Sequence, residues 1–306
     1  MARRYTASRP QRPNPPAPSQ ETPMHPAIRS AAAALTAITL LGACTSTPHA
    51  PVSPAEVGEL RPGAGYLKGY LGREELPDSL ALLPPPPAEG TPAHADDADA
   101  FRQLTAMQKG PRGALATRDA NLKFPQTAGA FACALGVTVS EQGTPHLNML
   151  LRRTLTDAGL ATYKAKDQYK RTRPFVAFSA PTCTPAEEAA LSKDGSYPSG
   201  HAALGWAWAL VLTELAPERA DALLLRGRAF GQSRGICGVH WKSDIEAGRV
   251  IGAATVARLR VNEIFQAQLA AARKEVVRAR AAGQVPPAAD CTSETQTLRS
   301  SLQLAP

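Results

Sequence analysis

The sequence has few aromatic residues and no apolar run long enough to cross a membrane. Phe, Trp and Tyr make up 5% of the 306 residues. Segments that alternate apolar and polar side chains, as half-buried strands do, are nearly absent. No stretch reaches the ~18 uninterrupted apolar residues that a spanning helix needs. These absences argue against a β-sheet protein and against an integral membrane protein.

Two further absences narrow the function. The five cysteines show no Cys-x-x-Cys or Cys-x-x-His spacing, so we expect no metal in the functional site. No dense Lys/Arg run contains interleaved aromatics, so we expect no nucleic-acid partner. The net charge is +8, but five arginines against one glutamate give residues 1–43 half of it. The mild remaining excess fits a small anionic substrate, and equally no particular partner.

The first 43 residues are predicted to be a signal peptide. Residues 31–43 read AAAALTAITLLGA, thirteen residues without a charge, and Arg29 precedes them. This run is too short for a spanning helix and has the length of a signal-peptide core. Met24 starts a more typical signal than Met1 does, so it is a candidate for the true start.

The apolar run ends in Leu-Gly-Ala-Cys at residues 41–44, which resembles the lipobox of bacterial lipoproteins. In that motif, signal removal leaves a lipidated cysteine at the new N-terminus. We therefore expect lipidation of Cys44 and a periplasmic protein anchored to a membrane by this lipid. The alternative is a plain secretory signal followed by a coincidental cysteine.

Four cysteines remain for disulfides if Cys44 is lipidated: Cys133, Cys183, Cys237 and Cys291. An exported compartment permits disulfides, and an even count suits two of them. Three pairings are open. Because Cys183 and Cys237 flank the motifs described below, we favour a bond between these two. Free, buried cysteines are the alternative.

The chain beyond the signal is predicted to contain one helical domain. Residues 44–65 are rich in Pro, Ser, Thr and Gly and indicate a tether. Residues 66–272 form the domain, and residues 273–306 are a C-terminal extension, polar from about residue 284 and partly disordered. Apolar spacing predicts helices over 97–109, 128–139, 145–170, 185–192, 199–214, 217–236 and 240–271. The prediction is an all-α fold, a helical bundle whose short loops present the functional residues.

Three motifs carry residues suited to phosphate chemistry. In the third along the chain, Arg234 precedes His240 and Asp244. His240 and Asp244 are four residues apart, so on a helix they share a face. A carboxylate that holds one imidazole nitrogen fixes the tautomer and leaves the other nitrogen as a nucleophile. The planar guanidinium of Arg234 suits two phosphate oxygens.

The second motif, Gly-Ser-Tyr-Pro-Ser-Gly-His at residues 195–201, predicts an anion site at a helix N-terminus. Ser199 is a good N-cap, and the first backbone N–H groups of a helix are free to bind an anion. Gly200 allows an oxyanion to approach the backbone closely. His201 lies in the first turn, where a protonated imidazole can donate to a leaving oxygen.

The first motif adds two cations, Lys166 and the Arg173 that precedes Pro174. With Arg234 they can neutralise a phosphoryl group, whose transfer depends mostly on positioning and charge stabilisation. Taken alone, each motif has a simpler reading: a solvated basic helix end, a surface histidine, a structural ion pair or a simple helix cap. Their occurrence in one order within about 80 residues favours the functional reading.

The order Lys-x6-Arg-Pro, Pro-Ser-Gly-His, Ser-Arg-x5-His-x3-Asp resembles the signature of the type 2 phosphatidate phosphatase superfamily. This superfamily includes vanadate-dependent haloperoxidases and the class A bacterial non-specific acid phosphatases. Residues 76–80 and the following proline run, with residues 171–175, 195–201 and 231–241, are most similar to class A. No motif position departs from the pattern.

The resemblance implies a helical bundle of the acid phosphatase/vanadium-dependent haloperoxidase type and a two-step hydrolysis of phosphomonoesters without a cofactor. His240 would attack phosphorus, Asp244 would orient His240, and His201 would act as acid and then base. The phosphate oxygens would be held by Lys166, Arg173, Ser199, Gly200 and Arg234. Broad specificity towards small phosphorylated substrates and homo-oligomerisation are also implied.

Three alternatives stay open on the sequence alone. A vanadate-dependent haloperoxidase would use the same cluster of cations to bind vanadate. A membrane-lipid phosphatase is disfavoured by the lack of spanning helices, although a lipid anchor would bring the site near a bilayer. A non-catalytic envelope lipoprotein that only binds anions would need the motif residues for binding alone.

Overall fold

The computed structural model describes residues 49–301, which fold into helices and loops. Within that range the β pairing consists of one isolated bridge, Glu59–Leu67. The longer helices are α3 (Pro92–Thr105), α4 (Pro111–Ala120), α6 (Pro145–Leu160), α10 (Gly200–Leu215), α11 (Ala220–Ile236), α12 (Lys242–Leu259), α13 (Glu263–Ala281) and α14 (Ala288–Arg299). The predicted all-α fold is confirmed.

Shorter helical segments connect these helices. They are α1 (Pro54–Val57), α2 (Ser79–Leu82), α5 (Ala132–Leu135), α7 (Tyr163–Tyr169), α8 (Pro174–Ala177) and α9 (Glu188–Leu191). Single 3-10 turns lie at Arg73–Glu75, Pro185–Glu187 and Pro217–Arg219, and a longer 3-10 segment covers Gln126–Phe131. A proline opens many of these elements, because its fixed φ and missing N–H suit the first turn of a helix.

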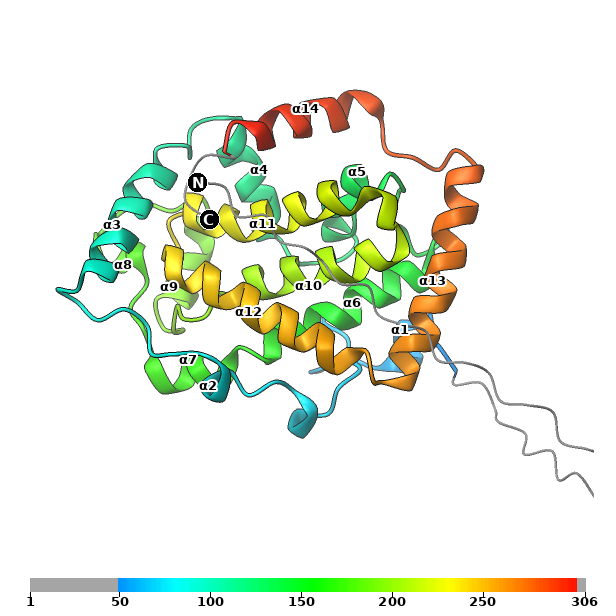
Figure 1. The fold of residues 1–306 in the computed structure, drawn as a ribbon, viewed down its shortest axis with the longest axis horizontal. Helices are drawn as coiled ribbons and strands as arrows, with labels where there is room; N and C mark the ends of the chain where they lie inside the picture. The colour runs from blue at the N-terminus through cyan, green and yellow to red at the C-terminus, as the bar shows by residue number, and fades with distance from the viewer. Residues whose placement is uncertain (1–48, 302–306) are drawn as a thin grey trace, which may run out of the picture. The chain divides into compact units, whose positions relative to one another are not determined.

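Helix α10 is the centre of the core. Its sequence, GHAALGWAWALVLTEL, is apolar around most of its circumference, which is typical of a helix surrounded by other helices. Helices α11 and α12 lie alongside it, and α6 packs on it as well (Figure 1). Trp208 is fully buried and donates its indole N–H to the carbonyl of Leu151 on α6, 3.0 Å away. The indole dipole is therefore satisfied inside an apolar cluster.

Two glycines let α12 approach α10 backbone to backbone. A Cβ on Gly248 would lie 2.4 Å from the carbonyl oxygen of Ser199, and one on Gly252 would lie 2.3 Å from that of Ala203. Neither distance is tolerated by real Cβ atoms, so only glycine permits this spacing. The approach places the N-terminal end of α10 beside the first half of α12, and so brings the second and third motifs together.

The predicted helix over 128–139 is reduced to part of a 3-10 segment and the four residues of α5, since Gly136 takes a left-handed conformation that ends it. Two longer predicted helices are each divided in the structure. The range 240–271 forms α12 and α13, because the chain turns at residues 260–262 and Asn262 caps α13 by accepting from the N–H of Phe265. The range 145–170 forms α6 and α7, with a break at residues 161–162. Apolar spacing continues across both breaks, so the spacing alone does not reveal them.

Two of the longer helices, α4 and α14, were not predicted, and neither were the short helices α1, α2 and α8. The buried face of α4 includes Arg112 and Asp119, and α14 has a single buried side chain, Leu298. Neither helix therefore shows an apolar stripe. The expected domain boundary after residue 272 falls inside α13, and the described part of the C-terminal extension is largely helical.

Disulfides join Cys183 to Cys237 and Cys133 to Cys291. The first is the bond that the sequence favours, and it ties the loop before α9 to the turn after α11. The second ties α14 to α5. In the described part of the chain, no helix is both long and apolar enough to cross a bilayer.

The predicted signal peptide and Cys44 lie outside the described residues. Of the predicted tether, residues 49–65 are described: they are mostly exposed and contain the single turn of α1.

Candidate active site

His240 lies two residues before the start of α12, where it is 3% exposed. Asp244, at the third position of that helix, reaches back so that its Oδ2 is 3.3 Å from His240 Nδ1. The same oxygen accepts the backbone N–H of Trp241 at 2.9 Å. The two residues therefore meet across a helix N-terminus and not along one helical face. The contact still leaves His240 Nε2 as the ring nitrogen free of Asp244.

Arg173 lies against that second nitrogen. Its Nη1 is 3.1 Å from His240 Nε2 and donates to the carbonyl of Val239 at 3.0 Å. Arg173 is the N-cap of α8, and the extended backbone that precedes a proline places it there. The guanidinium is 3% exposed.

Lys166 shares partners with Arg173. It projects from α7 and donates Nζ to the carbonyl of Gly195 at 2.5 Å, while Arg173 Nη2 lies 3.4 Å from the same oxygen. Both cations also approach one carboxylate oxygen of Asp194, Arg173 at 3.0 Å and Lys166 at 3.6 Å. The structure thus places the two cations of the first motif next to each other.

Arg234 is in the last turn of α11 and is 1% exposed. Its Nη2 lies 3.7 Å from Glu187 Oε2. Its Nε and Nη1 are buried and have no hydrogen-bond partner among the described residues. Burying the donors of a charged group without hydrogen-bond partners costs free energy. This guanidinium is therefore suited to donate to an anionic ligand.

The N-terminus of α10 completes the cluster. Ser199 caps the helix, accepting the N–H of Ala202 at 3.3 Å. The N–H of Ser199 donates to the carbonyl of Asp244 at 2.9 Å, which joins the second motif to the third. Gly200 is the first residue of the helix and His201 the second. The N-terminus of α10, the positive end of its helix dipole, therefore lies beside the motif that contains His240. It adds to the positive charge that the cations offer to an anion.

His201 is oriented by one hydrogen bond and one stacking contact. Its Nε2 lies 3.0 Å from the carbonyl of Ala120 at the end of α4, an acceptor that favours the Nε2–H tautomer. Its ring stacks on Phe230, with centroids 6.2 Å apart. Nδ1 is thus the nitrogen left for proton exchange.

Burial and neighbouring cations lower the pKa values of this cluster. Burial, followed by the charges of Arg173, Lys166 and Arg234, holds the pKa of His240 well below its ordinary value. The pKa of His201 is also held well below its ordinary value, first by burial and then by Arg234.

The pKa values of the cations themselves also fall. Burial, then the charge of Arg173, lowers the pKa of Lys166 to about 8, and burial lowers that of Arg234 to about 10. These shifts reflect several cations buried close to one another.

Four residues outside the predicted site contact it. Arg171 and Asp97 hold Asp244 and the start of α12, while Asp194 and Glu187 approach the cations. Asp194 directly precedes the Gly-Ser-Tyr-Pro-Ser-Gly-His motif, and Arg171 lies two residues before Arg173. That adjacency was the available signal for these two, whereas nothing in the sequence singles out Asp97 or Glu187.

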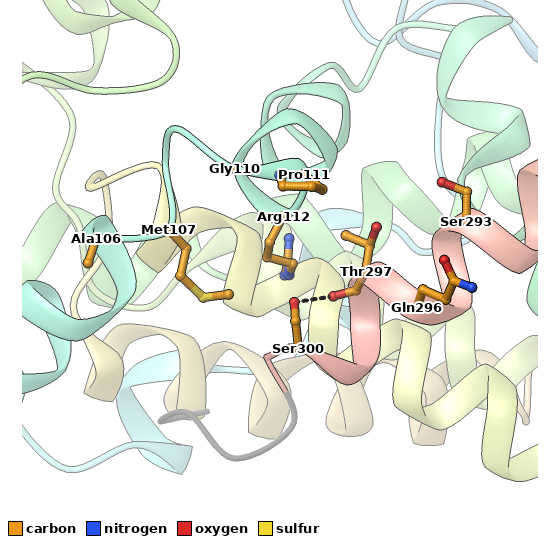
Figure 2. Close-up of a pocket in the computed structure, with 9 residues that line it drawn as sticks. All are labelled: Ala106, Met107, Gly110, Pro111, Arg112, Ser293, Gln296, Thr297 and Ser300. Carbon is orange, nitrogen blue, oxygen red and sulfur yellow. Dashed lines mark hydrogen bonds between the residues drawn. The ribbon is translucent and has the colours of Figure 1, made fainter.

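A cavity of about 400 Å³ lies elsewhere, between the turn joining α3 to α4 and the polar side of α14 (Figure 2). Met107 and Arg112 line one side, and Ser293 and Thr297 line the other. No residue of the three motifs lines it. It therefore is not the site of the chemistry.

Comparison with known proteins agrees with this arrangement. The PAP2 superfamily profile matches residues 147–263, which contain all eight motif residues that the structure gathers. The chain is 42% identical to a non-specific acid phosphatase of Providencia stuartii, over 79% of this chain and 96% of that protein. It is 45% identical to one of Salmonella typhimurium, over 66% and 82%.

An acid phosphatase of Zymomonas mobilis is 39% identical over 68% of this chain and 79% of its own length. Each relative is matched over most of its length and well above the identity at which a family is shared. The chain therefore belongs to the class A non-specific acid phosphatases of the PAP2 superfamily.

Proposed function

We propose that this acid phosphatase hydrolyses phosphomonoesters through a phosphohistidine on His240. One observation carries the proposal: Asp244 holds Nδ1 of a buried imidazole whose Nε2 faces Arg173. A lone pair directed into a cluster of cations is suited to attack an electron-poor phosphorus.

In the first step, His240 Nε2 forms a bond to phosphorus and the bond from phosphorus to the ester oxygen breaks. His201 gives its proton to the leaving alkoxide, which departs as an alcohol. Lys166, Arg173 and Arg234 stabilise the charge on the phosphoryl oxygens, and Ser199 and Gly200 bind them at the start of α10. Arg173 must first exchange its contact with His240 for a phosphate oxygen.

In the second step, the neutral His201 removes a proton from water. The resulting hydroxide attacks phosphorus, the phosphorus–nitrogen bond breaks, and inorganic phosphate leaves. His240 returns to its neutral form and His201 is again protonated. Asp244 stabilises the imidazolium form of His240 in between.

We also propose broad specificity. The residues that gather at His240 are suited to the phosphoryl group, which every phosphomonoester carries. Two of the compared relatives are named non-specific acid phosphatases.

The test compares His240→Ala with His49→Ala, a control at a highly exposed histidine. We expect wild type and control to hydrolyse p-nitrophenyl phosphate, vanadate to inhibit, and His240→Ala to lose about 10³-fold or more of kcat. Rapid quenching with labelled substrate should trap an acid-labile, base-stable phosphoenzyme in wild type alone. Unchanged activity of His240→Ala contradicts the mechanism, and vanadate-dependent bromide oxidation would favour a haloperoxidase.

We propose, from the sequence alone, that the protein is exported to the periplasm and anchored by a lipid on Cys44. Labelled palmitate supplied to expressing cells should then mark the wild type and not Cys44→Ser. Equal labelling of both proteins would exclude the anchor. Phosphatase activity should be the same in both, since the proposed mechanism gives Cys44 no role in the reaction.

A further inference from the structure

Arg171 differs from the other cations near the site in where its guanidinium points. Nη1 donates to Asp244 Oδ1 at 2.7 Å and to Ser243 Oγ at 2.8 Å, and Nη2 donates to Asp97 Oδ2 at 2.7 Å. The same group lies 5.1 Å above the ring of Trp241. Its hydrogen bonds are directed to carboxylates and a hydroxyl, whereas Arg234 keeps unpaired donors.

Asp97 approaches the same place from α3, almost 150 residues away in the chain. Its Oδ1 accepts the backbone N–H of Ser243 at 2.8 Å, and its Oδ2 accepts the Ser243 hydroxyl at 2.6 Å. Ser243 is the second residue of α12 and Asp244 the third. Asp97 therefore accepts one of the free N–H groups of the first turn, that of Ser243, from outside the helix. Figure 1 shows α3 at the end of the bundle where α12 begins.

Each oxygen of the Asp244 carboxylate has its own partners. Oδ1 accepts from Arg171, while Oδ2 accepts from the Trp241 N–H and faces His240 Nδ1. The carboxylate is fully buried, so a change in its orientation cannot be compensated by water. Rotation about its last bond would cost the Arg171 bond and the His240 contact together.

We propose that Arg171 and Asp97 are positioning residues that lock the Asp244 carboxylate against His240 Nδ1, and that neither binds phosphate. The inference rests on the proposed role of His240. Arg171 acts directly on Asp244, and Asp97 acts through Arg171 and Ser243. Their loss should slow the attack of His240 on phosphorus and leave the affinity for phosphate nearly intact.

The first experiment separates positioning from phosphate binding. We expect Arg171→Gln to lower kcat at least 10-fold while the inhibition constant of inorganic phosphate changes less than 3-fold. Arg234→Gln should raise that inhibition constant at least 10-fold. Arg102→Gln, which removes an exposed ion pair on α3 with Asp99, is the matched control and should match wild type. If Arg171→Gln weakens phosphate binding as much as Arg234→Gln, or leaves kcat unchanged, the proposal is wrong.

The second experiment separates positioning from a merely structural role. Guanidinium ion at non-denaturing concentration should restore at least a tenth of the kcat lost in Arg171→Ala, and Arg171→Lys should keep more activity than Arg171→Gln. Asp97→Asn should lower kcat several-fold, and its control Asp99→Asn should not. No rescue, together with a loss of kcat that follows a loss of folded protein, would overturn the proposal.

A third measurement does not depend on turnover. Nitrogen-15 spectra of the histidine rings should show a single Nδ1–H tautomer for His240 in wild type and a mixture in Arg171→Gln. Identical tautomers in both proteins overturn the positioning role even if the wild type is an active phosphatase. Conversely, a wild type without phosphatase activity contradicts the proposed function, while the tautomer still tests the role of Arg171.

Discussion

At the scale of single residues, the proposed mechanism needs His201 and His240 to differ in protonation. Burial and surrounding cations lower the pKa of both His201 and His240 in the ligand-free protein. This suits a nucleophile, which needs a neutral imidazole, and does not suit an acid. A bound phosphate dianion supplies the missing negative charge, so we expect it to raise the pKa of His201.

The lowered pKa values predict how activity and histidine titration depend on pH. Since the pKa of His240 lies below the unperturbed ~6.5, the free enzyme keeps a neutral nucleophile in mild acid, and protonation of His240 should begin to lower kcat/KM only below that pH. Proton NMR titration of the rings, assigned with His201→Asn and His240→Asn, should give midpoints below ~6.5 for both histidines. With saturating inorganic phosphate, the His201 midpoint should move to higher pH.

The same shifts affect stability. In the unfolded chain both imidazoles take up protons near pH ~6.5, and in the folded protein they do so only at lower pH. The contribution of these two histidines to the free energy of unfolding should therefore decrease as pH falls below that value. Titration midpoints at or above ~6.5 in the free protein would contradict both the activity and the stability argument.

At the scale of helices, the site depends on the close contact between α10 and α12. Gly252 faces the carbonyl of Ala203, and backbone atoms cannot move aside as a flexible side chain can. Gly248 makes the same kind of contact with the carbonyl of Ser199. The spacing of these helices sets the distance between the start of α10, where we propose that phosphate binds, and Asp244.

Gly252→Ala should therefore separate the two helices. We expect the free energy of unfolding to fall by about 1–3 kcal/mol, as for other overpacked cores, together with a lower kcat. Gly159→Ala on α6 is the control, because a Cβ there meets nothing within 4 Å, and alanine should leave stability unchanged or raise it slightly. Urea unfolding and p-nitrophenyl phosphate turnover of both variants check this. Equal stability of Gly252→Ala and wild type would contradict the packing argument.

The sequence predicts the helices and the site to different extents. Apolar spacing identifies α10, whose buried side chains are all apolar, and it misses α4, whose buried Arg112 and Asp119 are satisfied by polar partners. Each of the three motifs is a short stretch of sequence, so together they identify the residues that lie near His240. Asp97 is not identified, since only the tertiary fold brings α3 to α12. Pairings between distant segments leave no periodic signal.

At the scale of the whole molecule, residues 288–301, which contain α14, are attached to the rest of the structure by one disulfide and a few polar contacts. Cys291 on α14 bonds to Cys133 on α5, 158 residues away. Beyond α14, Ser301 Oγ accepts from Arg112 Nε at 3.2 Å, and Arg112 Nη1 donates to Ser233 Oγ at 2.9 Å. Arg112 thus links Ser301, at the end of the described chain, to Ser233, the residue before Arg234.

Because α14 buries only one side chain, the disulfide should supply most of its attachment. Replacing Cys133 and Cys291 together by serine should lower the free energy of unfolding by about 2–5 kcal/mol, since a crosslink over so long a loop restricts the unfolded chain strongly. The double variant should also be cleaved by trypsin after Arg280, directly before the segment that leads to α14, faster than wild type. Ser293→Ala, at an exposed position of α14, is the control and should match wild type in both measurements. Equal unfolding midpoints and cleavage rates for the double variant and wild type would show that the polar contacts around Arg112 hold α14 without the bond.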